Sequence, residues 1–114
     1  MSERSQKLFL SDIIESIDAI RVYVAGVDFD YFCSDRKTFA ATIHELEIIS
    51  EAIRNIFDEI KLQYPEVLWQ EIRSFRNKIT REYFGVDSRI VWDIVQNELD
   101  LLKDKIFHIL AVIK

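Results

Sequence analysis

The chain has 114 residues, with 15 lysines and arginines against 20 aspartates and glutamates, so its formal net charge is −5. This length fits a single domain spanning residues 1–114, and a hydrophobic share of 49% excludes a disordered chain. The negative charge excludes indiscriminate nucleic-acid binding, because the molecule as a whole does not attract phosphate. Two glycines and one proline allow few turns, which favours long helices over a many-stranded sheet.

The cysteine count and the hydropathy pattern indicate where the protein works. The single cysteine, Cys33, excludes an internal disulfide and fits a reducing compartment. The stretch MSERSQKLFL has no apolar run of signal-peptide length, and no run elsewhere approaches the length of a membrane span. We therefore expect a soluble, cytoplasmic protein that does not engage a membrane.

The first predicted helix covers residues 7–25, and the segment after it is predicted to be a loop. Apolar residues at three- and four-residue steps mark the helix, and Gly26 is a plausible stop. The segment VDFDYFCSD is rich in aspartate and aromatic residues. Asp28 and Asp30 in it either bind a cation or belong to a solvated loop, and Ser34 or Asp35 is available to cap the next helix.

Three more helices follow in the prediction. The second spans residues 35–62, and the third begins at Pro65, where a missing N–H costs nothing, and ends between residues 83 and 85. Asp87 or Ser88 caps the fourth, which runs to the C-terminus. Its apolar positions form two adjacent rows. The first row contains Val91, Val95, Leu102, Ile106, Ile109 and Ile113, and the second contains Ile94, Leu101 and Leu110. An all-α, up-and-down four-helix bundle is predicted, and the wide apolar band suggests burial against a second chain.

The third predicted helix carries the strongest chemical signal, a cluster of basic residues. Residues three, four and seven apart share a helix face, so Arg76, Thr80 and Tyr83 form one polar row, and Arg73, Asn77 and Arg81 form the adjacent row. Lys78 adds a further positive charge. Forked guanidinium groups on neighbouring rows are suited to holding one phosphate. The alternative is a solvated helix face whose arginines pair with Glu71 and Glu82.

The segment WQEIRSFRNKITREYFGVDSRIVW resembles the signature region of HepT-like toxins, a branch of the HEPN superfamily of helical domains. In that family Arg-Asn is followed by three variable residues, His, one variable residue and Tyr, and then by a Val-Asp turn and a Val-Trp. The matching positions here are Trp69, Ile72, Arg76, Asn77, Tyr83, Val86, Asp87, Val91 and Trp92. The stretch IHELEIISEAIRNI is similar to the family's second helix, including its Glu51-Ala52 pair, and the resemblance implies the same four-helix layout.

The resemblance implies the toxin component of a type VII HepT/MNT toxin–antitoxin system. Such toxins are metal-independent ribonucleases, without a cofactor, whose Arg and His line a cleft at the homodimer interface. Arg81 stands where the family has the His. Histidine transfers protons near neutral pH, whereas the pKa of arginine is above about 12. The resemblance therefore implies that Arg76, Asn77 and Arg81 occupy the catalytic positions and that Arg73 and Lys78 bind RNA. We expect cleavage to be lost or greatly reduced.

The resemblance also implies a partner and a modification. In the family a minimal nucleotidyltransferase (MNT) antitoxin transfers AMP groups to the tyrosine that Tyr83 matches. These anionic groups, placed beside an arginine-lined cleft, would repel RNA. The expected RNA is a tRNA or an mRNA. The alternative for Tyr83 is packing at the helix end. Two other functions stay open: a non-catalytic nucleotide-binding or scaffolding module that partners a nucleotidyltransferase, and a bundle that serves only in assembly.

The remaining candidate residues point to structure rather than chemistry. His44 and His108 show no metal-ligand spacing with a cysteine or carboxylate, and we expect His44 on the surface and His108 partly buried. Cys33 is expected to be a buried small side chain. Trp69 and Trp92 are expected to pack in the core or at the subunit interface. No metal site is predicted.

Overall fold

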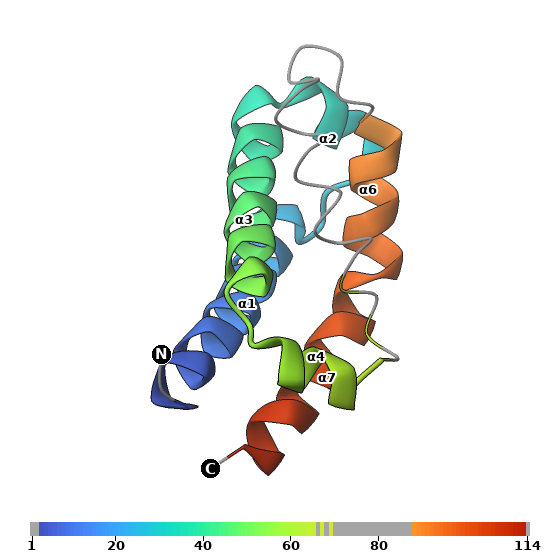
Figure 1. The fold of residues 1–114 in the computed structure, drawn as a ribbon. Coiled ribbons are helices and arrows are strands. Elements are labelled where there is room, and N and C mark those ends of the chain that lie inside the picture. The colour runs from blue at the N-terminus through green and yellow to red at the C-terminus, as the bar shows by residue number, and fades with distance from the viewer. Residues whose placement is uncertain (1–2, 66, 68, 70–87, 114) are drawn as a thin grey trace.

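The computed structural model describes residues 3–65, 67, 69 and 88–113, and every regular element among them is helical. The helices are α1 (Glu3–Val24), α2 (Phe29–Ser34), α3 (Arg36–Arg54), α4 (Asp58–Gln63), α6 (Ser88–Asn97) and α7 (Leu99–Val112). In Figure 1, α1 leads away from the end of the molecule that holds both termini, whereas α3 and the α6–α7 pair lead back towards it. The predicted all-α class is confirmed. The third predicted helix lies almost entirely outside the described residues; Pro65 is in a turn, and Trp69 is helical.

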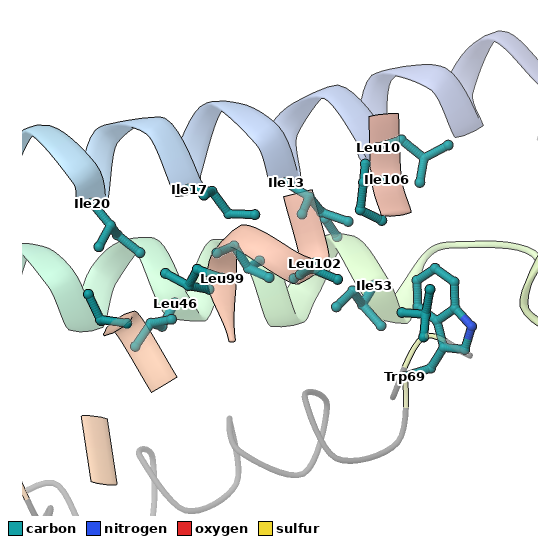
Figure 2. Close-up of a cluster of buried hydrophobic side chains, with 14 of the residues drawn as sticks. Leu10, Ile13, Ile17, Ile20, Leu46, Ile53, Trp69, Leu99, Leu102 and Ile106 are labelled. Atoms are coloured by element: carbon teal, nitrogen blue, oxygen red, sulfur yellow. The ribbon is translucent and has the colours of Figure 1, made fainter. Parts of the chain in front are cut away.

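The core lies between α1, α3 and α7, whose apolar rows face one another (Figure 2). On α1 the row predicted from the sequence is buried, and its members are Ile13, Ile17, Ile20 and Val24, with Leu10 one turn earlier. Burying such a side chain stabilises the fold by about 1.5–3 kcal/mol before entropy losses are counted. Polar contacts at the edges fix the pairing of the helices: Tyr23 donates to Glu45 (3.0 Å), and Lys103 donates to Asp18 (2.6 Å).

The segment that follows α1 contains a helix, so the prediction of a loop over residues 27–35 is wrong. Gly26 has a positive φ of 72° and ends α1 as expected. Asp28 then caps α2, because its carboxylate accepts a hydrogen bond from the backbone N–H of Tyr31 (2.8 Å). Phe32 is fully buried, which gives this short helix an anchor in the core. Asp28 thus serves as a helix cap in the structure.

The start of α3 is as predicted. Asp35 occupies the N-cap position, but its carboxylate makes no capping hydrogen bond to the backbone and instead accepts one from the Thr38 hydroxyl (2.5 Å). This bond holds the pKa of Asp35 below its usual value, because it favours the charged form.

The second predicted helix is shorter than expected: α3 ends at Arg54, and α4 begins only at Asp58. The break is tied to α1 by Gln6, a fully buried side chain. Gln6 donates from Nε2 to the carbonyl oxygen of Asn55 (3.1 Å), and its Oε1 accepts the backbone N–H of Phe57 (2.6 Å). The side chain therefore satisfies backbone groups that a continuous helix would have paired internally.

The fourth predicted helix is divided at Glu98 into α6 and α7. Backbone hydrogen bonds nevertheless run through the division, since the N–H of Glu98 donates to the carbonyl oxygen of Ile94 (3.0 Å) and the N–H of Leu102 donates to that of Glu98 (3.0 Å). The first apolar row is buried except for Ile113, which is half-buried, whereas Leu101 in the second row is 61% exposed. The predicted second chain against this band stays a prediction. None of the helices in the described ranges is long and apolar enough to cross a bilayer.

Candidate functional site

The basic cluster predicted from the sequence lies outside the described residues. It comprises Arg73, Arg76, Asn77, Lys78, Arg81 and Tyr83, all within residues 70–87. Their arrangement therefore stays a prediction from the helical spacing. What the structure describes is how the chain is held immediately before and immediately after this segment.

The chain before the segment is anchored by Trp69. This side chain is buried, and its indole Nε1–H donates to the carbonyl oxygen of Tyr64 (3.1 Å). Figure 2 shows Trp69 at the end of the row of core side chains to which Ile53 belongs. The ring of Tyr64 meets the ring of His108 on α7 edge to face, with centroids 6.0 Å apart. The prediction that Trp69 packs in the core is confirmed, and this packing fixes where the basic segment begins.

The chain after the segment is anchored by an aromatic cluster between α2 and α6. Trp92 packs against Phe32, with ring centroids 5.0 Å apart, and meets Phe29 edge to face at 6.1 Å. Phe32 also contacts Phe39 of α3 at 5.4 Å. Arg89, the second residue of α6, places its guanidinium carbon 3.8 Å from the centroid of the Phe29 ring. Such cation–π contacts stabilise by about 0.5–1 kcal/mol at exposed sites.

The contact between Arg89 and Phe29 was missed by the sequence analysis. The two residues are far apart in the chain, and neither belongs to a motif with a spacing that would pair them. Only the fold, which packs α2 against the start of α6, brings them together (Figure 1). Arg89 did have one sequence signal, a position inside the signature segment between Asp87 and Val91.

Three other predicted positions can be compared with the structure. His44 is exposed on α3, as expected. His108 is exposed rather than partly buried, because it lies outside the buried row of α7. Cys33 is exposed rather than buried, because the α2 helix turns its neighbour Phe32 into the core instead. Among the residues that the structure describes, no group of three or more His, Cys, Asp or Glu side chains is placed to hold a metal ion.

The family model and the similar proteins found by comparison point to the same family. A family model described as "Ribonuclease HepT-like" matches residues 13–109. A Thermococcus cleftensis protein named "Probable ribonuclease HepT" is 41% identical over 103 residues, which cover 90% of this chain and 94% of that protein. A Methanocaldococcus jannaschii protein named as a candidate RNase is 36% identical over 99 residues, covering 87% of this chain and 82% of its own. A second protein from the same organism, also named as a candidate RNase, is 34% identical over 106 residues, which cover 93% of this chain and 97% of that protein. No solved structure gives a significant match.

Proposed function

Because the chain belongs to the HepT-like ribonuclease family, we propose that it is the toxin component of a type VII HepT/MNT toxin–antitoxin pair. In this proposal two copies form a homodimer, and the basic segments of both subunits line one RNA-binding cleft. The observation that carries the proposal is the family match over residues 13–109, which includes the whole segment from Arg73 to Tyr83. Cytoplasmic RNA, a tRNA or an mRNA, is the proposed ligand.

The proposed reaction needs both charge stabilisation and proton transfer. When a ribose 2′ oxygen attacks the adjacent phosphorus, the bond from phosphorus to the next 5′ oxygen breaks. The attacking hydroxyl gives up a proton, and the departing oxygen takes one. Arg76 stabilises the negative charge that develops on the phosphate, and Asn77 orients the arginine or contacts the phosphate. Arg73 and Lys78 bind the flanking backbone of the RNA.

Arg81 is the residue that limits catalysis in this proposal. It occupies the position of the family's histidine, and its guanidinium remains protonated at every physiological pH. It can hold a phosphate oxygen, but it provides neither a general base nor an efficient general acid. The proposed chain therefore binds RNA and cleaves it poorly or not at all, without a metal or another cofactor taking part.

The proposed regulator is a minimal nucleotidyltransferase antitoxin that transfers AMP to Tyr83. Each AMP group brings a phosphate to the tyrosine hydroxyl, beside the arginines that otherwise bind RNA. The added negative charge then occupies the cationic site and repels the RNA backbone. The exposed Leu101, beside the buried apolar row of α7, supports a subunit interface in the same proposal.

The residue at position 81 also favours a second candidate function. A chain without a proton-transfer residue fits a non-catalytic module that binds a nucleotide or holds a nucleotidyltransferase in place. Recovery of cleavage on restoring the histidine supports the toxin, whereas no cleavage together with nucleotide binding supports the module. A chain that dimerises and binds neither RNA nor nucleotide would serve in assembly alone.

The experiment that tests the proposal is RNA binding by a variant of the central arginine. Arg76→Gln is expected to weaken binding of a single-stranded 2′-O-methyl RNA by about 10- to 100-fold, because a charge-assisted phosphate contact is lost. The oligonucleotide lacks the attacking hydroxyl, so fluorescence anisotropy measures binding without cleavage.

The matched control is Arg54→Gln, which removes the same charge from the exposed C-terminal end of α3. It is expected to bind as the unchanged protein does. Equal affinity of the Arg76 variant and the unchanged protein, or no RNA binding by either, would contradict the proposal.

A further inference from the structure

The break between α3 and α4 is a feature that no residue within the break requires. Residues 54–59 read RNIFDE and include neither glycine nor proline, so each of them can adopt helical backbone angles. Ile53, Ile56 and Ile60 keep the three- and four-residue steps of one helix face across the break, and the first two are buried. A continuous helix over residues 36–63 is therefore an alternative that the local sequence allows.

Gln6 of α1 binds two backbone groups that such a continuous helix would pair internally. Its Nε2 donates to the carbonyl oxygen of Asn55 (3.1 Å), which in a continuous helix accepts the N–H of Glu59. Its Oε1 accepts the N–H of Phe57 (2.6 Å), which in a continuous helix bonds to the carbonyl oxygen of Ile53. Gln6 is fully buried, so its side chain makes these bonds away from water. One side chain thus takes the place of two helical partners.

The backbone of the break shows which bonds are local and which come from α1. The N–H groups of Asn55 and Ile56 bond three residues back, at 3.0 and 3.1 Å, and Asn55 Nδ2 donates to the carbonyl oxygen of Glu51 (2.8 Å). These local bonds tighten the last turn of α3. Phe57 has a ψ of 141°, far from the helical value, and the partner of its N–H is Gln6. The departure from the helix at Phe57 is therefore linked to α1.

The position of Gln6 in α1 makes this link sensitive to one helical turn. Gln6 is the fourth residue of α1, so unwinding the first turn of that helix is enough to withdraw both hydrogen bonds. The break in turn lets the chain cross from α3 to α7: α4 lies beside α7 in Figure 1, and the Tyr64 ring meets the His108 ring with centroids 6.0 Å apart. The first turn of α1 therefore governs where α4 lies.

We propose that Gln6 is a latch between two conformations of residues 36–63. With Gln6 bound, the segment is broken into α3 and α4; with Gln6 withdrawn, it forms one continuous helix. In the broken form without Gln6, the carbonyl oxygen of Asn55 and the N–H of Phe57 both lose their partners, which is unfavourable. In the continuous helix both groups are paired again. The proposal is independent of RNA binding and of the basic segment.

The test is Gln6→Met, which keeps an unbranched side chain of similar length and removes both hydrogen bonds. Nuclear magnetic resonance measures the Cα chemical shift and the amide exchange rate of Phe57. We expect the Cα shift to move from the extended to the helical range. The exchange rate should stay within about tenfold of that in the unchanged protein, because the N–H gains a helical partner. Gln96→Met makes the same substitution at an exposed site of α6 and should change neither quantity.

A break set by local residues alone predicts the opposite result. The Cα shift of Phe57 in Gln6→Met would stay in the extended range, and its amide would exchange more than about tenfold faster, because the N–H has lost its partner. An extended Cα shift in this variant overturns the proposal. Should Gln6→Met fail to fold, amide exchange in the unchanged protein decides. Protection of the Phe57 amide equal to that of Ile53 within α3 supports the latch, and exchange as fast as that of an exposed turn overturns it.

Discussion

Replacing Arg81 by histidine is expected to raise the rate of RNA cleavage by about 10²- to 10⁴-fold, the usual contribution of general acid–base catalysis. Imidazole has a pKa near 6.5, so it can accept the proton of the attacking 2′ hydroxyl and return one to the departing 5′ oxygen. The arginine now at this position does neither. The measurement is cleavage of a fluorescent RNA by the unchanged protein and by the variant, prepared in parallel.

The pH dependence and a second substitution identify the source of that activity. Cleavage by Arg81→His should change between about pH 5 and 8, where histidine titrates, whereas the unchanged protein should show no such dependence. Adding Arg76→Gln to the variant should abolish the gain, because the developing charge on the phosphate is no longer stabilised. Equal cleavage by the unchanged protein and by Arg81→His would contradict the account of an inactivated site.

The second large effect is expected at Phe32. Phe32→Ala should lower the free energy of unfolding by about 3–5 kcal/mol, because the fully buried ring contacts both Phe39 and Trp92. A cavity at this point removes the contact that joins α2 to α3 and α6. Urea denaturation followed by circular dichroism measures the change.

The neighbouring residue gives the control for this substitution. Cys33→Ala removes a side chain of α2 that is exposed, so its effect should lie within about 0.5 kcal/mol. If Phe32→Ala costs less than about 1 kcal/mol, the aromatic cluster is not the anchor of α2 that the structure indicates. Loss of this anchor should also release Arg89 from its defined position on Phe29.

The helices predicted well from the sequence are those whose apolar spacing is enough to define both the helix and its buried face. On α1 the spacing of Ile13, Ile17, Ile20 and Val24 gives both the helix and its buried face, and Gly26 marks its end. The elements predicted poorly depend on residues distant in the chain. The apolar spacing continues through Ile53, Ile56 and Ile60, and the break after α3 is tied to Gln6 of α1.

The same distinction applies to α2 and to the candidate site. A six-residue helix is too short to show a clear period, and Phe32 is buried in a core where the distant residues Phe39 and Trp92 pack against it. The basic segment was identified from residue types and spacing, and it lies outside the described residues. The contact of Arg89 with Phe29 could come only from the structure, since no local pattern relates the two positions.

The central claim is that the segment from Arg73 to Tyr83 binds RNA, and photo-crosslinking tests it most directly. The unchanged protein is irradiated with a 4-thiouridine-containing RNA, digested, and analysed by mass spectrometry for peptides that carry a nucleotide. We expect the crosslinked peptides to come from residues 73–83. Crosslinks confined to other parts of the chain, such as α1, would contradict the account.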